Sequence, residues 1–166
     1  PMYRDFRDRN SVFSGVIARY DTGLAVSHRG QSELVSAELV SGNYFEVLGV
    51  APALGRGLTP SDDVTPGAHP VAVLGHGYWQ RRFGADPSLV GQSLSVNGQP
   101  MTVIGVMEEK GIVGTTDYDS YVFMPITVVF QKFTPSMFAR FMGDSIRMIY
   151  VEIDPDENID DIITQV

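Results

Sequence analysis

The stretch Ser93–Met107, SLSVNGQPMTVIGVM, decides how the middle of the chain folds. Asn97–Gly98 is a dipeptide preferred in two-residue type I′ turns, because both positions of that turn need a positive φ. A turn at these two residues fixes the register of the flanking strands, so Val96 faces Gln99. Pro100 then falls at a site without a ladder hydrogen bond, where its missing N–H does no harm. The stretch therefore predicts a β-hairpin of two antiparallel strands.

Other segments carry the apolar alternation or the short apolar runs of strands. Val16–Ser27 is predicted to be a strand that a turn near Asp21–Gly23 interrupts. After a turn at His28–Gln31, a second strand is expected over Glu33–Val40. Further strands are predicted over 71–75, 119–126 and 145–153.

Helical spacing of apolar residues is found over 3–13, 42–49, 76–84, 127–141 and 154–166. In the second of these segments, Ser41 is the expected cap and Gly49 the expected stop. Tyr44, Phe45 and Leu48 are expected to point inward. Because helices and strands mix without a regular strand–helix–strand period, the predicted fold class is α+β.

The composition limits the classes of function. The chain has 166 residues, 43% of them hydrophobic, which suffices for one ordinary domain or for two small lobes that share a core. A net charge of −8 argues against nucleic acid and anionic membrane as direct partners, because both recruit Lys and Arg. The absence of cysteine excludes disulfides, thiolate metal sites and cysteine nucleophiles. No apolar run reaches the roughly 18 residues that span a bilayer.

The acidic stretch Asp154–Ile163, DPDENIDDII, resembles the start of a calcium-binding EF-hand loop. The match fails at the sixth position, where Ile159 replaces the required Gly, and at the twelfth, where Gln165 replaces the bidentate Glu. Acidic residues also favour the positive end of a helix dipole, and an apolar stripe follows them. The stretch is therefore interpreted as the start of a helix.

The segment Val71–Gln80, VAVLGHGYWQ, resembles a dinucleotide-binding turn, with Gly75 and Gly77 opening a helix. Gln80 replaces the third glycine, and a β-hairpin follows where a second parallel strand is needed. Nucleotide binding is therefore not expected.

The remaining polar residues do not form a chemical motif. The three histidines, His28, His69 and His76, lack zinc-ligand spacing, and no serine lies in a Gly-x-Ser-x-Gly elbow. Asp62–Asp63 and the pair Asp117 and Asp119 are interpreted as solvated surface acids. The sequence thus predicts no catalytic, cofactor-binding or metal-binding residue.

Two long blocks carry a family resemblance. Val40–Asp63, VSGNYFEVLGVAPALGRGLTPSDD, and Val71–Met107 resemble the MacB-like periplasmic core domain of FtsX-type permeases of ABC transporters. The family has a short aromatic helix, a Gly-Arg turn and an Asp-rich loop, and then an apolar strand, a Phe-Gly turn and a strand ending Val-Ile-Gly-Val. DSYVFMPIT and SIRMIYVEID match two later blocks, so the resemblance covers Tyr3–Val166.

The resemblance implies a two-lobed extracytoplasmic domain between two transmembrane helices of a larger protein. A porter-like α+β lobe would comprise residues 1–50 and 125–166, with an inserted β-rich lobe at 51–124. The domain would be periplasmic, anchored by flanking membrane helices, and an apolar segment of about 20 residues is expected soon after the final helix. The implied role is mechanical and non-enzymatic, with no cofactor. Implied partners are a second permease subunit in a homodimer, a cytoplasmic ATPase and a periplasmic adaptor protein.

Candidate contact residues lie in loops on a rigid frame, where partners usually attach. They are Arg56, Asp62 and Asp63 in the loop-rich stretch 55–70, and Asn97 and Gly98 at the hairpin tip. The alternative is a free-standing periplasmic ligand-binding module or hydrolase, which needs a concave site with convergent polar groups. A secreted calcium-dependent adhesion module is a third hypothesis.

Overall fold

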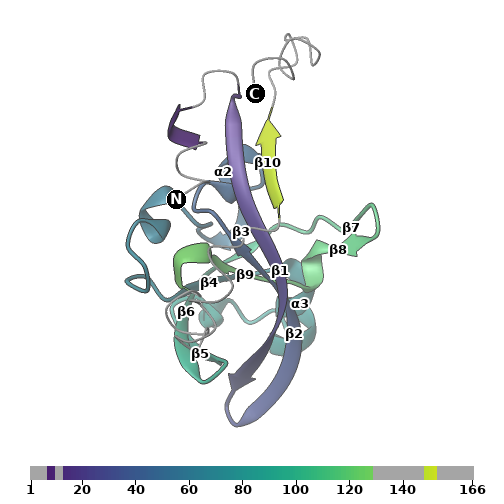
Figure 1. Ribbon diagram of the computed structural model, residues 1–166. Coiled ribbons are helices and arrows are strands. Elements are labelled where there is room, and N and C mark those ends of the chain that lie inside the picture. Colours follow the sequence, from purple (N-terminus) through teal and green to yellow (C-terminus); the bar gives the residue numbers. More distant parts are fainter. Residues whose placement is uncertain (1–6, 10–12, 129–147, 153–166) are drawn as a thin grey trace.

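The structure is a computed structural model that describes residues 7–9 and 13–128, and the backbone of 148–152. Within these ranges one eight-stranded sheet organises the chain, with the strand order β10-β1-β2-β9-β4-β6-β3 and with β5 beside both β1 and β6 (Figure 1). A two-stranded ribbon of β7 and β8 projects from it (Figure 1). The α+β class is confirmed.

The strands are β1 (Gly15–His28), β2 (Gln31–Val40), β3 (Pro52–Gly55), β4 (Val71–Leu74), β5 (Ser93–Val96), β6 (Gln99–Met107), β7 (Ile112–Val113), β8 (Thr116–Asp117), β9 (Val122–Pro125) and β10 (Met148–Glu152). The helices are α2 (Tyr44–Val47) and α3 (His76–Phe83), with 3₁₀ turns η1 (Pro60–Asp63), η2 (Pro87–Leu89) and η3 (Tyr118–Ser120).

The first hairpin is longer than the sequence predicts. β1 runs for 14 residues without a break, so the expected turn near Asp21–Gly23 is wrong. Asp21 pairs with Glu38 and Gly23 with Ser36 in the antiparallel ladder to β2, which keeps both residues extended. The chain reverses at Arg29–Gly30, where φ is 49° and 80°, so the predicted turn at His28–Gln31 is confirmed. Two positive φ values are what a two-residue hairpin turn requires.

The hairpin of β5 and β6 has the predicted register, with Val96 opposite Gln99. Asn97 and Gly98 both have positive φ, 47° and 81°. The Asn97 N–H donates to the Ala25 carbonyl, and the Asn97 Oδ1 accepts from the Ala25 N–H, both at 2.8 Å. The turn residue thus ties the hairpin to β1 as well as reversing the chain.

The centre of the sheet is built from β4, α3 and β6. β4 is parallel to β6 and antiparallel to β9, and α3 crosses over between β4 and the β5–β6 hairpin. α3 begins after Gly75 and ends at Gly84, which has the left-handed φ of 61° that a glycine stop favours. Gly75 also permits a close approach, because a Cβ there would lie 2.5 Å from the Asp119 carbonyl oxygen.

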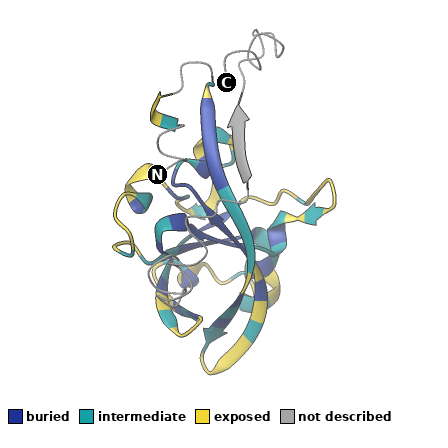
Figure 2. Ribbon diagram, in the orientation of Figure 1, coloured by how far each residue is buried: buried dark blue, intermediate teal, exposed yellow. Residues whose placement is uncertain are grey.

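Two apolar clusters lie on opposite faces of the sheet, because successive side chains of a strand point to opposite sides. In β9, Val122 and Met124 belong to the larger cluster, which Tyr78 of α3 joins. Phe123 belongs to the smaller cluster, which Tyr44 and Phe45 of α2 cover. The buried strands cross the middle of the molecule, as Figure 2 shows.

Helix α2 is a single turn, shorter than predicted. Tyr44 and Phe45 are buried as expected, and Gly49 follows with a φ of 61°. Leu48 is 48% exposed, so its expected inward position is wrong; a one-turn helix presents too few positions to the sheet to bury it. Ser41 does not cap the helix with its side chain, because its Oγ accepts a hydrogen bond from the Ala18 N–H at 3.1 Å.

Several predicted elements fall wholly or partly outside the described residues. Of the helices expected over 3–13 and 127–141, only short described pieces are helical, at 7–9 and 126–128, and the helix expected over 154–166 lies outside. The strand predicted over 145–153 is confirmed as β10, and the one over 119–126 is shorter, β9. In the described part, no helix is long and apolar enough to cross a membrane. Strands from both expected lobes join the one sheet, and the boundary between the lobes stays a prediction.

Candidate functional site

A buried polar network lies where β1, β2 and α2 meet. Glu38 of β2 has no exposed surface. Arg19 lies two residues from Asp21, the cross-strand partner of Glu38, so its side chain reaches the carboxylate diagonally and forms an ion pair through Nε. The Tyr44 hydroxyl donates to Glu38 Oε2 at 2.8 Å. One carboxylate oxygen is therefore in an ion pair, and the other accepts a hydrogen bond.

Arg19 extends this network to η3 and along β1. Its Nη1 donates to the Tyr118 hydroxyl oxygen at 2.8 Å, and its Nη2 donates to Asp21 Oδ2 at 3.1 Å. The guanidinium carbon also lies 5.7 Å from the centre of the Tyr118 ring. One arginine thus connects β1, β2 and η3.

The protonation of these groups follows from burial and pairing. Burial raises the pKa of Glu38, and the Tyr44 hydrogen bond and the Arg19 charge oppose that shift. Burial alone would lower the pKa of Arg19, but the bond to Tyr118 and the charge of Glu38 outweigh it and raise the pKa. Burial and the nearby Glu38 also raise the pKa of Tyr44. Arg19 and Tyr44 therefore hold their protons near neutral pH, which suits a structural role better than proton transfer.

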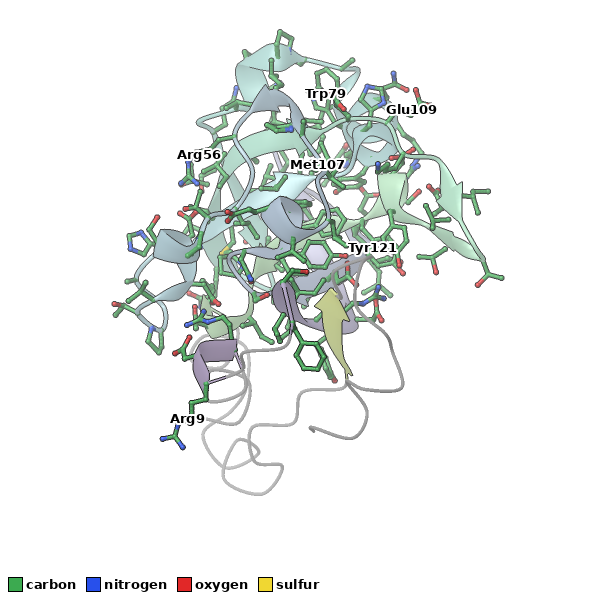
Figure 3. All side chains as sticks on the ribbon, turned by 90° about the horizontal axis from the view of Figure 1, so that it is seen from above. Arg9, Arg56, Trp79, Met107, Glu109 and Tyr121 are labelled. Carbon is green, nitrogen blue, oxygen red and sulfur yellow. The ribbon has the colours of Figure 1, made fainter. Side chains whose placement is uncertain are left out.

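A cavity of about 300 Å³ lies beside this network. Its walls come from α2, from the face of the sheet that carries the smaller apolar cluster, and from the loop that follows β6. Figure 3 labels Met107 at the end of β6. The residues that line it are Ile17, Arg19, Tyr44, Phe45, Leu48, Val50, Gly75, Met107, Glu108, Lys110, Val113, Tyr118, Asp119 and Phe123. Sequence reasoning missed this site, because its members come from segments that lie far apart in the sequence.

The first group of predicted contact residues forms a tight local structure. Arg56 holds Asp62 with both ends of its guanidinium, at 2.7 and 2.8 Å. The backbone N–H and the hydroxyl of Thr59 also donate to the same carboxylate, at 2.9 and 2.8 Å. The bond to Arg56 is the main cause that lowers the pKa of Asp62 to about 2. Asp62 is 5% exposed in its side chain, whereas Arg56 is half exposed and lies at the periphery in Figure 3.

Asp63 bridges two segments. Its Oδ2 accepts from the Gly42 N–H at 3.3 Å, and its Oδ1 accepts from the Thr127 N–H at 3.1 Å. It connects the loop before α2 to the residues after β9. Asp62 and Asp63 both belong to the 3₁₀ turn η1, which lies within the loop-rich stretch 55–70.

Two acids expected to be solvated are buried, so that expectation is wrong for Asp62 and Asp119. The Asp119 carboxylate accepts hydrogen bonds from the backbone N–H groups of Lys110 and Gly111, at 2.9 and 2.7 Å. These bonds replace the hydrogen bonds to water that the carboxylate loses on burial. For Asp62, the spacing Thr59-x-x-Asp62 is a capping-box pattern that could have revealed the role from sequence. No local pattern marks Asp119, because its partners lie eight and nine residues away.

The second group of predicted contacts, Asn97 and Gly98, lies exposed at the tip of the β5–β6 hairpin. The structure joins this tip to β1 through Ala25. Whether these residues, or Arg56, Asp62 and Asp63, touch a partner stays a prediction.

The histidines do not converge. His28 packs edge-on against Phe83, with ring centres 5.5 Å apart, and His76 lies 5.7 Å from the Trp79 ring. Burial and two nearby arginines lower the pKa of His28. Within the described residues, no three or more histidine or acidic side chains are grouped so that they could hold a metal ion.

Comparison with known families places this fold. Residues 2–166 match the family model described as the MacB-like periplasmic core domain. The chain belongs to this family. This MacB-like domain is 31% identical over 125 residues to the macrolide export ATP-binding/permease protein MacB of Chlorobaculum tepidum, covering 75% of the chain and 18% of that relative. The chain thus spans less than a fifth of the length of this curated relative.

Solved structures share the fold of this MacB-like domain. The periplasmic region of MacB from Actinobacillus actinomycetemcomitans has a TM-score of 0.77 at 22% identity, covering 99% of this chain and 69% of that one. The extracellular domain of the ABC-type transporter YknZ from Gram-positive bacteria has a TM-score of 0.73 at 16% identity, covering 98% and 75%. At these identities the likeness establishes the fold.

Proposed function

We propose that this MacB-like domain is the non-enzymatic, extracytoplasmic part of an ABC transporter permease. In this role it transmits the motion of membrane helices to substrate efflux or to a docked partner. The observation that carries the proposal is the family match over residues 2–166, together with a relative named as an export permease. The expected location is the periplasmic face of the inner membrane.

The arrangement of the first and last described strands supports a mechanical role. β1 and β10 are antiparallel neighbours, and Gly15 lies opposite Glu152. The segments before β1 and after β10 therefore meet the sheet at the same end, as a domain inserted between two adjacent membrane helices requires. From this end β1 runs 14 residues, roughly 45 Å, to the turn at Arg29–Gly30. A movement of the anchored end would reach the other end along one continuous strand.

The buried network would make this strand rigid. Arg19 lies in the first half of β1 and holds β2 through Glu38 and η3 through Tyr118. A displacement of β1 along its axis would separate these paired groups, and unpaired buried charges are costly. β1, β2 and η3 are thus expected to move as one body.

The partner contacts are proposed for the exposed turns. The tip Asn97–Gly98 lies beside β1, because Val26 pairs with Val96. It therefore lies toward the same end as the β1–β2 turn at Arg29–Gly30, away from the anchored end (Figure 1). We assign an adaptor protein to this distal end. In the proposed transporter, the parent permease also pairs with a second copy of itself and with a cytoplasmic ATPase. Arg56 is a further candidate contact, with Asp62 and Asp63 supporting its loop.

Spin labels test the proposed coupling without a known substrate. The parent protein, labelled at Leu34→Cys in the exposed part of β2, is reconstituted in lipid nanodiscs, and pulsed electron resonance measures distances between labels on two copies. The distance distribution is expected to shift between the nucleotide-free state and the ATP-bound state. A label at Pro100→Cys, an exposed position beside the hairpin tip, should shift in the same direction, because both sites belong to one rigid body. Identical distance distributions in both states, or no measurable dipolar coupling between labels on two copies, would contradict the proposal.

A further inference from the structure

The cavity beside the Arg19 network offers an apolar interior. Tyr44, Phe45 and Phe123 form a connected aromatic wall, with ring centres 5.3 to 6.1 Å apart. Ile17 and Met107 add aliphatic surface. Aromatic and aliphatic linings of this kind, at a volume of about 300 Å³, are at the small end of ligand pockets.

The polar side chains inside the cavity already have partners. Arg19 is held by Glu38, Asp21 and Tyr118, and the Tyr44 hydroxyl donates to Glu38. Both oxygens of Asp119 accept from the backbone of the loop after β6. A ligand is therefore not required to satisfy any of these groups, and the surface they leave to it is apolar.

The walls are fixed in advance. The Arg19 network orients the two tyrosine rings through their hydroxyls, and Asp119 fixes the start of the β7–β8 ribbon at Lys110 and Gly111. A preformed pocket binds without the entropy cost of ordering its walls.

Apolar side chains remain in water at the mouth of the cavity. Leu48, directly after α2, is 48% exposed and Val113 of β7 is 55% exposed, and both line the cavity. Glu108 and Lys110, which also line it, are exposed and carry opposite charges. An apolar group entering here would cover Leu48 and Val113, while a polar head would stay in solvent among charges that sum to zero.

We propose that this pocket is a binding site for the apolar part of a small amphiphile with an uncharged or zwitterionic head. The site requires only the described fold, so it stands or falls separately from the mechanical role proposed above. A pocket of this size fits one apolar tail or ring system, so one molecule binds per chain.

The neutral fluorescent probe N-phenyl-1-naphthylamine tests the site on the 166-residue chain. We expect saturable binding of one probe per chain, with at least tenfold weaker binding in Leu48→Glu and in Val113→Glu. Both positions are about half exposed, so each variant is expected to fold, which circular dichroism and an unchanged Tm verify. The matched control is Leu34→Glu, at an 80% exposed position that does not line the pocket, and its affinity should equal that of the wild type.

Displacement identifies which part of the ligand is recognised. Dodecylphosphocholine below its micelle concentration is expected to displace the probe, whereas phosphocholine alone is not. Non-saturable binding, equal weakening by the Leu34 control, or displacement by phosphocholine alone would overturn the proposal. A third result would also overturn it: the chain self-associates, probe binding falls as it does so, and Leu48→Glu abolishes the association. A second copy of the chain would then fill the pocket.

Discussion

The Tyr44 hydroxyl lies 2.8 Å from Glu38 Oε2, and the carboxylate that accepts its hydrogen bond is completely buried. This contact joins α2 to β2 beside the apolar pocket, which Tyr44 lines. A buried carboxylate that loses a donor keeps its desolvation cost without compensation. Position 44 therefore requires the hydroxyl group of tyrosine as well as its aromatic ring.

Replacing Tyr44 by Phe should lower the free energy of unfolding by about 1–3 kcal/mol, because it leaves Glu38 Oε2 without its donor. Urea denaturation measures the change. The control is Tyr121→Phe, since the Tyr121 hydroxyl has no hydrogen bond to a described residue and its ring packs on Tyr118 and Phe123. Equal losses in the two variants would show that the hydroxyl of Tyr44 contributes nothing specific.

The Glu38→Leu variant should lose about 3 kcal/mol, because it leaves the Arg19 charge buried without its closest ion-pair partner. Adding Arg19→Met should recover much of this loss, since two apolar side chains replace the buried pair. Chemical denaturation of the four proteins of this double-mutant cycle gives the coupling. Simple additivity of the two single losses would refute the pairing.

Asp62 should make stability depend on acid pH. Its folded-state pKa of about 2 lies below the ordinary value of 3.8, so the charged form favours the fold. This contribution is present above about pH 4 and is lost as the pH falls from 4 to 2. Solvent screens the half-exposed Arg56, so we expect on the order of 1 kcal/mol.

The test compares unfolding free energies at several pH values between 2 and 7. Asp62→Asn should be less stable at pH 7 and should show a shallower decline between pH 4 and 2. The exposed Glu109→Gln is the control and should follow the wild-type slope. An Asp62→Asn curve parallel to the wild type would be evidence against the ion pair.

Gly75 should resist even a methyl group. A Cβ at this position would lie 2.5 Å from the Asp119 carbonyl oxygen and 2.7 Å from that of Tyr118, so backbone must move. Gly75→Ala is expected to cost about 2 kcal/mol or more and to weaken binding in the pocket that Gly75 lines. Gly57→Ala is the control: its Cβ would lie 3.4 Å from the Phe45 ring, so its Tm should change little. A Gly75→Ala protein with the wild-type Tm would show that the approach is not tight.

The parts of the fold that local patterns control could be predicted from the sequence. The turn at Asn97–Gly98, the glycine stop of α3 and the strand β4 depend on neighbouring residues, and all three are confirmed. The unbroken β1 could not be predicted, because Asp21 and Gly23 are turn formers by local preference. Their pairing with β2 overrides that preference through a ladder with partners 13 to 17 residues away.

The candidate site was hidden for a similar reason. The residues around the pocket are ordinary core and loop residues in the sequence, and only the sheet brings Ile17, Met107 and Phe123 together. The same is true of Glu38, which looks like a surface residue of an alternating strand but lies diagonally opposite Arg19. Long-range pairing, not composition, creates both features.

The proposed periplasmic location of the domain can be tested by cysteine labelling. The 166 residues contain no cysteine, so a single cysteine can be placed in this domain at the exposed Leu34 or at the buried Leu94, in a parent protein whose other cysteines are replaced by serine. In intact cells made permeable only at the outer membrane, a membrane-impermeant maleimide should label Leu34→Cys at once and Leu94→Cys only after denaturation. Labelling of Leu34→Cys only after the inner membrane is broken would place the domain in the cytoplasm and rule out the proposed function.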